Sequence, residues 1–198
     1  MEQNEWDQRY SGTELVWTAE PNRWVAEELT GEHPGRALDL GTGEGRNAIW
    51  LAEQGWQVTA VDFSPVGLAK AARLAAGRHV TVSWVQADLR QYQPGEGKYD
   101  LVLIAYIQLP KAEFDALLRG AAAALAPGAT LLVIGHDVDN IARGHGGPQD
   151  PAILHRSGDV VDALPGLTIR RAGQARRPVR TADGERVAID TVVRAQRG

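Results

Sequence analysis

The chain contains no cysteine and no long apolar run, and both absences narrow its possible roles. Without cysteine, disulfides, thiolate zinc sites and cysteine nucleophiles are excluded. The longest uncharged apolar run, residues 101–109, is far too short to cross a bilayer, and the acidic, polar opening is unlike a signal peptide. We therefore expect a cytoplasmic protein without a membrane partner.

Internal repeats and low-complexity segments are also missing, so neither a repeat array nor a disordered tract is expected. The 198 residues, 43% of them hydrophobic, suit a single domain over residues 1–198 with a buried core. Residues 167–198 hold eight arginines against three acids, in a chain whose formal net charge is −4. Because no aromatic residues are interleaved with these arginines, we interpret them as the solvated face of terminal strands and predict no nucleic-acid partner.

What the sequence does have is a glycine-rich turn between an apolar strand and a helix. The strand ends in an acid, Asp39, and Gly41, Gly43 and Gly45 follow before a helical pattern begins. Side chains at the first two glycines would hold a ligand off the backbone N–H groups. The next apolar strand ends in a second acid, Asp62, which suits the two hydroxyls of a ribose. The pattern predicts a nucleotide site.

The kind of nucleotide follows from two positions. The dinucleotide fingerprint G-x-G-x-x-G needs a glycine where this chain has Arg46, which would crowd the helix against the strand. Asp39 would repel a pyrophosphate, whereas it suits a cation such as the ammonium group of an amino acid. An NAD(P)-dependent oxidoreductase is therefore the weaker alternative, and a glycine-rich turn in some other α/β protein stays open.

Strand and helix patterns alternate along most of the chain. After a short helix following Pro21, we predict strands over residues 37–40, 58–62, 80–86, 99–106 and 130–135, with helices over 46–54, 65–76 and 110–125. A Pro-Gly turn is expected at 126–128, a long loop at 136–156 and a short helix at 158–164. Strands over 167–174 and 186–195, joined by a long connection, would form a hairpin. The predicted fold is α/β, a Rossmann-like doubly wound sheet of seven strands, mostly parallel, with a C-terminal antiparallel hairpin and helices on both faces.

The run Asp39-Leu-Gly41-Thr-Gly43-Glu-Gly45 matches (D/E)-x-G-x-G-x-G, the first motif of class I S-adenosylmethionine-dependent methyltransferases, and the chain resembles that family over roughly residues 36–135. The resemblance implies S-adenosyl-L-methionine as cofactor, S-adenosyl-L-homocysteine as product and a small-molecule methyl acceptor. It implies these cofactor-binding residues: Trp6, Arg9, Trp17, Asp39, Gly41, Thr42, Gly43, Arg46, Asn47, Asp62, Phe63, Ser64, Ala87, Asp88, Leu89 and Ala105.

Some of these residues have particular roles in the family. Asp62 would hold the ribose hydroxyls, with Phe63 against the adenine, and Asp88 would reach the adenine amino group. Ala105 and Tyr106, at the end of the fourth strand, would border the reactive methyl group. Within the family, the opening Trp-Asp-Gln-Arg-Tyr and the loop Gly-Glu-Gly-Arg-Asn-Ala are similar to the small tellurite-resistance and thiopurine type of methyltransferase. This similarity implies that residues 1–33 cover the cofactor or the substrate.

A sulfonium methyl group is already activated, so such an enzyme mainly aligns the nucleophile with it. A soft or anionic nucleophile needs no general base, whereas a hydroxyl or amine that must lose a proton can need one. Tyr106 and His136, at the ends of the fourth and fifth strands, are the predicted catalytic residues. The alternative for His136 is a hydrogen bond to loop backbone. The loop over residues 136–156 is expected to lie over the substrate site.

The remaining alternatives concern metals and other substrates. His136-Asp-Val-Asp139-Asn140 contains residue types that bind hard metals, but metal-dependent relatives draw such ligands from separate strand ends, so we predict no metal. Residues 104–110 lack the Asn/Asp-Pro-Pro-Tyr/Phe motif of many nucleic-acid methyltransferases. We therefore predict a small-molecule methyltransferase acting on a sulfur, oxygen, nitrogen or oxyanion acceptor. A non-catalytic S-adenosylmethionine-binding domain is the main alternative.

Overall fold

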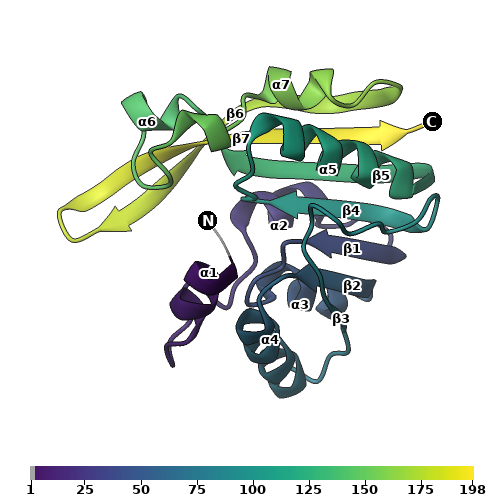
Figure 1. The fold of residues 1–198 in the computed structure, drawn as a ribbon, viewed down its shortest axis with the longest axis horizontal. Coiled ribbons are helices and arrows are strands. Elements are labelled where there is room, and N and C mark those ends of the chain that lie inside the picture. The colour runs from purple at the N-terminus through teal and green to yellow at the C-terminus, as the bar shows by residue number, and fades with distance from the viewer. Residues whose placement is uncertain (1–2) are drawn as a thin grey trace.

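A seven-stranded sheet in the order β3-β2-β1-β4-β5-β7-β6 runs through the protein, whose structure is a computed structural model that describes residues 3–198 (Figure 1). Strands β3, β2, β1, β4 and β5 pair in parallel, and β7 pairs antiparallel with both β5 and β6. This arrangement confirms the predicted fold class. The strands are β1 (Arg36–Leu40), β2 (Gln57–Asp62), β3 (Ser83–Gln86), β4 (Tyr99–Ala105), β5 (Leu125–His136), β6 (Leu167–Thr181) and β7 (Gly184–Arg197).

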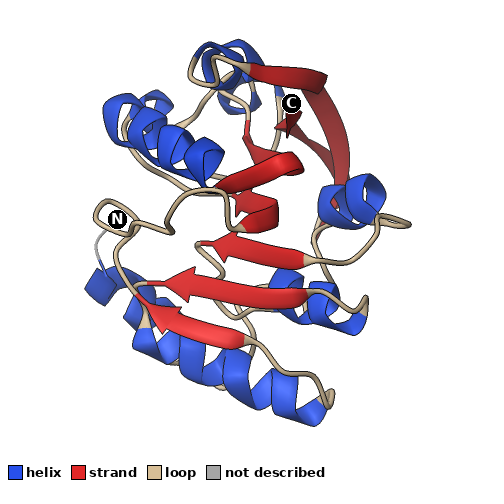
Figure 2. Cartoon of the chain, turned by 90° about the vertical axis from the view of Figure 1, so that its right-hand side faces the viewer, coloured by secondary structure: helices blue, strands red, loops and turns tan. Residues whose placement is uncertain are grey.

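Helices lie on both sides of the sheet, as Figure 2 shows. No helix among the described residues has the length and apolar character needed to span a membrane. The helices are α1 (Gln3–Tyr10), α2 (Arg23–Leu29), α3 (Arg46–Glu53), α4 (Pro65–Gly77), α5 (Lys111–Ala124), α6 (Asn140–Arg143), α7 (Ser157–Asp162) and the 3-10 helix η1 (Pro151–Ile153).

The two faces of the sheet bury separate hydrophobic cores because strand side chains alternate between faces. In β4, Val102 and Ile104 belong to the core formed with α5, whereas Leu101 and Leu103 belong to the core formed with α2 and α3. All four side chains are fully buried. A central strand covered on both faces therefore appears in the sequence as a continuous apolar run.

The parallel register brings the carboxyl ends of the first strands to one edge. Leu40 of β1 lies opposite Val61 of β2 and Ile104 of β4, and Ala105 lies opposite Ile134 of β5. The residues that end or directly follow these strands consequently gather at this edge: 41–45, 62–64, 106 and 136. In sheets of this kind ligands bind outside the carboxyl ends of the strands.

Two strand predictions were wrong at their ends. The strand predicted over 80–86 begins only at Ser83, because the Val80 N–H donates to the Ala75 carbonyl and so finishes α4. The turn predicted at 126–128 lies inside β5, where the register with β4 shifts and Gly128 adopts a φ of 78°. The Pro-Gly pair therefore makes an irregularity within a strand rather than a separate turn.

The segments after β5 also differ from prediction. Residues 136–156 are not one irregular loop, since α6 and η1 lie within them. The predicted long connection in the hairpin is wrong, because β6 and β7 run on to a turn at residues 182–183. The ladder with β5 stops at His136 opposite Asp190, so the hairpin beyond this pair projects past the sheet as a two-stranded arm (Figure 1). Pro178 is tolerated there because β6 is an edge strand.

Candidate active site

The glycine-rich loop, residues 41–45, leaves β1 in a conformation that favours glycine. Gly41 and Gly43 have φ values of 79° and 57°, in the left-handed region that side chains rarely adopt. A Cβ on Gly43 would lie 2.7 Å from the Tyr10 hydroxyl oxygen, and one on Gly41 would lie 2.0 Å from Cδ1 of Ile107. Both backbone conformation and lack of space therefore require glycine here.

Asp39, within β1, is a buried acid whose surroundings favour the binding of a cation. Its carboxylate accepts a hydrogen bond from the Thr42 hydroxyl at 2.7 Å. Burial raises the pKa of Asp39 to about 6 in spite of that hydrogen bond. A positive charge beside such an acid stabilises its ionised form. The position is electrostatically suited to an ammonium group.

Asp62, at the end of β2, is hydrogen-bonded to the backbone of the glycine-rich loop. Its two carboxylate oxygens accept hydrogen bonds from the Gly43 N–H at 2.8 Å and the Ser64 N–H at 2.9 Å. Burial raises the pKa of Asp62 more than these hydrogen bonds lower it. Ser64 caps α4 by accepting from the Gly67 N–H, and the half-buried Phe63 lies between the two. We call Asp39, residues 41–45 and Asp62 the loop half of the site.

The N-terminal helix packs against the loop half. Helix α1 lies beside α4 (Figure 1), and the Ser64 hydroxyl donates to Asp7. Tyr10 is buried against Gly43, and its ring stacks on that of Trp6 at a centroid distance of 5.4 Å. The aromatic opening of the chain is therefore part of the packed structure.

A buried ion pair holds the following segment in place. Glu44 accepts hydrogen bonds from the Val16 and Trp17 N–H groups and pairs with Lys70 of α4 at 3.0 Å. Lys70 also donates to the Glu14 carbonyl. Because both charged side chains are almost fully buried, loss of either would leave the other unpaired. Glu44 thereby fixes residues 14–17 beside the glycine-rich loop.

The predicted cofactor residues near α1 and α3 divide into two groups. Arg46 begins α3 with its guanidinium 5.7 Å from the ring of Trp17, which is 45% exposed, and burial lowers the pKa of Arg46. Arg9 lies 5.1 Å over the Trp6 ring, on the exposed side of α1. Arg46 and Trp17 therefore adjoin the loop, whereas the side chain of Arg9 lies over Trp6 of its own helix.

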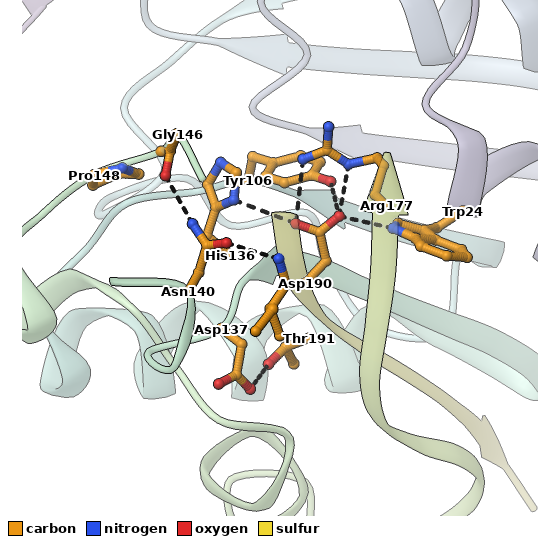
Figure 3. Close-up of polar contacts among 12 residues, drawn as sticks. Trp24, Tyr106, His136, Asp137, Asn140, Gly146, Pro148, Arg177, Asp190 and Thr191 are labelled. Atoms are coloured by element: carbon orange, nitrogen blue, oxygen red, sulfur yellow. Dashed lines mark hydrogen bonds and ion pairs between the residues drawn. The ribbon is translucent and has the colours of Figure 1, made fainter. Parts of the chain in front are cut away.

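The second half of the site is a network centred on Asp190, a fully buried acid of β7 (Figure 3). Its carboxylate accepts hydrogen bonds from Trp24 Nε1 at 2.8 Å, the Tyr106 hydroxyl at 2.9 Å and Arg177 Nε at 2.8 Å. His136 Nδ1 lies 3.3 Å from Asp190 Oδ1, without the alignment of a hydrogen bond. We call these five residues the Asp190 network. It joins the two predicted catalytic residues, whose rings meet edge to face at 4.9 Å.

Asn22 connects the two halves. Its backbone N–H donates to Asn47 Oδ1 of α3 at 2.8 Å, and its side-chain amide donates to the Tyr106 hydroxyl at 3.3 Å. Asn47, a predicted cofactor residue, is buried and holds this connection. The same Asn22 caps α2 through the Trp24 N–H. One residue therefore fixes the start of α2 relative to both halves.

Tyr106 leaves β4 in an unusual backbone conformation. Its φ of 58° is rare for a bulky residue and is of a kind that clusters at functional sites. Burial raises its pKa well above the usual range, and the charge of Asp190 adds to that effect, so the phenol keeps its proton. The turn after Ala105 also carries Ile107 onto Gly41, where Leu89 lies as well.

The remaining predicted residues lie after β3 and after β5. Asp88 is bound by Arg90 at 2.7 Å, and this hydrogen bond lowers the pKa of Asp88. Ala87 donates its N–H to the Asp62 carbonyl. In the run that contains metal-ligand types, Asp137 accepts from Thr191, and Asp139 pairs with Arg156. Both acids thus serve to hold the segment after β5.

Sequence analysis missed Asp190, Arg177, Trp24 and Asn22, although one of them leaves a visible signal. Asp190 is the only charged residue in residues 187–193, which otherwise form an apolar run typical of a buried strand. The interpretation of every C-terminal arginine as solvent-facing was wrong for Arg177, whose side chain is 24% exposed and turned onto Asp190. The other partners come from separate elements and leave no local pattern.

Residues 37–128 match the family model described as a methyltransferase domain. This stretch runs from β1 to the irregularity in β5 and contains the whole loop half together with Tyr106. This part of the chain is therefore similar to methyltransferase domains. The match agrees with the methyltransferase class that the sequence predicts.

Known proteins agree with this assignment. Demethylmenaquinone methyltransferase of Thermus thermophilus is 34% identical over 125 residues, which are 62% of this chain and 55% of that protein. The chain thus spans about half the length of this methyltransferase relative. Among solved structures, that titled conversion of a disulfide bond into a thioacetal group during echinomycin biosynthesis has a TM-score of 0.79 at 20% identity, covering 98% of this chain and 91% of the other.

A second structure carries the product form of the cofactor. The N-methyltransferase NodS from Bradyrhizobium japonicum, in complex with S-adenosyl-L-homocysteine, has a TM-score of 0.72 at 16% identity. The likeness covers 98% of this chain and 97% of the NodS chain. At such identities the likeness establishes a shared fold rather than a shared substrate.

Proposed function

We propose that the protein transfers the methyl group of S-adenosylmethionine to a small-molecule nucleophile. The observation that carries this proposal is that the loop half and the Asp190 network lie along one edge of the sheet and are joined through Asn22. A cofactor on the first would meet an acceptor on the second. Placing two reactants in line is most of what methyl transfer from a sulfonium requires.

The residues present fit the cofactor. Asp39, with its raised pKa and lack of a close basic partner among its hydrogen bonds, suits the ammonium group, and Arg46 suits the carboxylate. Gly41 and Gly43 allow close approach to the loop backbone, and Asp62 would hold the ribose hydroxyls. When bound, S-adenosylmethionine supplies an activated methyl group at the end of β4.

Several finer points belong to the same proposal. We assign one methyltransferase domain to residues 1–198, with residues 1–33 covering the cofactor and 136–156 lying over the acceptor. The packing of Tyr10 on Gly43 and the anchoring of Trp17 by Glu44 support the first assignment and the tellurite-resistance or thiopurine type. A cytoplasmic location and the lack of a nucleic-acid partner stay predictions of the sequence.

Calorimetric titration tests the cofactor. Purified protein is titrated with S-adenosylmethionine and S-adenosylhomocysteine, and with NADH and NADPH as controls for the oxidoreductase alternative. We expect heat from the two adenosyl ligands alone, and at least a tenfold weaker affinity in Asp62→Ala. Heat with the nicotinamides alone would contradict the proposal.

A matched control separates the site from the fold. Asp162→Ala changes an exposed acid of α7 and should bind the adenosyl ligands as the unaltered protein does. Because Asp62 also supports Gly43 and Ser64, thermal unfolding of Asp62→Ala must be compared as well. Binding of the cofactor without turnover of any acceptor would favour the non-catalytic alternative.

A further inference from the structure

Asp190 is ionised and its hydrogen-bonding capacity is almost filled. Burial acts to raise its pKa, yet the contacts from His136, Arg177 and Trp24 outweigh burial and hold the pKa at about 2. The charge of Arg177, which lies 2.8 Å away, is paired with this carboxylate. The network therefore presents a fixed negative charge to His136 and no free cation.

The charge of Asp190 favours one tautomer of His136. Nδ1 lies 3.3 Å from Asp190 Oδ1, and although the two atoms are not aligned as a hydrogen bond, a carboxylate at that distance stabilises a proton on Nδ1. Nε2 then keeps its lone pair, and Figure 3 shows this nitrogen on the side of the ring away from Asp190. Of the other ionisable groups, Tyr106 meets the His136 ring edge to face, and Arg177 lies over the Tyr106 ring and pairs with Asp190.

A cavity of about 20 Å³ adjoins His136 and Tyr106 between the sheet and α5. That volume holds one water molecule or a single hydroxyl group. Gln108, which also lines it, has a buried Oε1 without a hydrogen-bond partner. No Asp, Glu, Lys or Arg among residues 3–198 lines the cavity. Besides apolar side chains, two polar residues line it: His155, whose Nε2 contacts the Leu109 carbonyl, and Thr191, whose hydroxyl donates to the His155 carbonyl.

We propose that His136 and Asp190 form a proton-accepting pair, and that the methyl acceptor is a neutral hydroxyl compound. This inference rests on the proposed methyl transfer. An anionic acceptor would find no unpaired cation in the cavity, and a cationic amine would find no unpaired acid. A neutral hydroxyl needs no counter-ion, and its one proton can be donated to the unprotonated Nε2 of His136.

Each proton and electron pair in the proposed methyl transfer can be followed. The acceptor oxygen forms its bond to the methyl carbon while the carbon–sulfur bond breaks, and the sulfur keeps that electron pair as a neutral thioether. The hydroxyl proton passes to His136 Nε2, and Asp190 stabilises the resulting imidazolium. Release of this proton to solvent restores the pair. His136 is the proposed base, and Asp190 is a positioning residue.

Nitrogen-15 NMR of the histidine rings tests the pair without any acceptor. In the ligand-free protein at alkaline pH, we expect His136 to show a protonated Nδ1 and an unprotonated Nε2, the signal being assigned by its loss in His136→Gln. In Asp190→Asn combined with Arg177→Gln, which removes both buried charges together, the ring should move toward protonation at Nε2. A protonated Nε2 in the unaltered protein, or no change in the variant, would overturn the proposal.

Methylation of simple probes tests the acceptor class. With S-adenosylmethionine, release of S-adenosylhomocysteine is followed for 4-methylphenol, thiophenol and selenite. We expect turnover of the phenol, with kcat reduced about 10²- to 10⁴-fold in His136→Gln and a smaller change in KM. His33→Gln, an exposed histidine at the opposite edge of the sheet, is the control. Faster turnover of thiophenol or selenite, unaffected by His136→Gln, would overturn the hydroxyl assignment.

The two proposals fail in distinguishable ways. Absence of cofactor binding by calorimetry would contradict methyl transfer whatever the tautomer of His136. Cofactor binding with the wrong His136 tautomer would contradict only the proton-accepting pair.

Discussion

Asp39 and Asp190 are both buried at the carboxyl edge of one sheet, yet burial raises the pKa of the first to about 6, and hydrogen bonds hold that of the second at about 2. The difference lies in their partners. Asp39 has the Thr42 hydroxyl, whereas Asp190 has donors from Trp24 and Arg177 as well as Tyr106. A neutral donor does not offset the desolvation of a carboxylate, but an ion pair with several donors does.

This contrast assigns different tasks to the two halves. In the loop half, a bound cation would stabilise the ionised form of Asp39. This is the behaviour expected of a residue that binds a charged ligand. The Asp190 network supplies its own cation, because Arg177 pairs with Asp190. We therefore expect changes in the network to affect folding first, and changes in the loop half to affect binding first.

The largest effect is expected from Asp190→Ala. The substitution leaves Arg177 without its ion pair and removes the acceptor of the Trp24 and Tyr106 donors. Breaking a buried pair from one side typically costs about 3–5 kcal/mol of unfolding free energy. Guanidinium denaturation followed by circular dichroism measures the change.

Removing both partners is the control for that experiment. Asp190→Ala with Arg177→Met should recover part of the loss, because no buried charge then stays unpaired. Arg170→Ala, at an exposed arginine bonded to Gln196, should change the free energy by less than about 0.5 kcal/mol. A cost for Asp190→Ala as small as that of Arg170→Ala would show that the network does not stabilise the fold.

Lowering the pH should also reduce the free energy of unfolding, by less than Asp190→Ala does. The folded pKa of Asp190 is lowered to about 2 from an ordinary value of 3.8, so its stabilising contribution is complete above pH 4. This contribution is lost as the pH falls from about 4 to about 2, and it amounts to roughly 2–3 kcal/mol. Denaturation at pH 5 and pH 2.5 measures it. Asp190→Asn with Arg177→Gln should lose correspondingly less over that range, and an equal loss would contradict the assignment.

The loop half was predictable because its determinants are close together in the sequence. Asp39, Gly41, Gly43 and Asp62 fall within a single strand–helix–strand unit, and each has a chemical reason to be where it is. Tyr106 and His136 were predicted to lie at the same edge, since they stand at the carboxyl ends of the apolar strands β4 and β5. Local patterns predict where each strand ends. Because parallel strands bring their carboxyl ends to one edge, residues at those ends can be predicted to lie together.

The Asp190 network was not predictable in the same way. Trp24 and Asp190 are 166 positions apart, and their hydrogen bond depends on how α2 packs against β7. Asp88 shows the opposite problem, because its local position is as predicted but Arg90, two residues away, binds its carboxylate. The hairpin arm was missed because Pro178 indicates a strand break, although an edge strand tolerates it.

A smaller effect is expected in the pH dependence of S-adenosylmethionine binding, which should depend on Asp39 of the loop half. The ammonium of S-adenosylmethionine should bind the ionised form of Asp39, whose pKa in the ligand-free protein is raised to about 6. Above pH 6 Asp39 is already ionised, so binding requires no loss of a proton. Below pH 6 Asp39 must lose a proton on binding, and each unit of pH should weaken the affinity for S-adenosylmethionine about tenfold, or by about 1.4 kcal/mol. Calorimetry at pH 5 and 7.5 measures this change. Asp39→Asn should bind more weakly at pH 7.5 and lose the dependence, and a flat response of the unaltered protein would contradict the placement of the ammonium.

The smallest effect is expected from Trp17→Ala, in the segment beside the loop half. The Trp17 ring is 45% exposed and lies 5.7 Å from the Arg46 guanidinium, an arrangement that contributes about 0.5–1 kcal/mol. Its backbone N–H, which donates to Glu44, is kept in the variant. Urea denaturation should therefore show a small loss for Trp17→Ala and almost none for Trp17→Phe, which preserves a ring. A loss above about 2 kcal/mol would mean that the segment stabilises the fold as strongly as the Asp190 network does, and the contrast between the two halves would not hold.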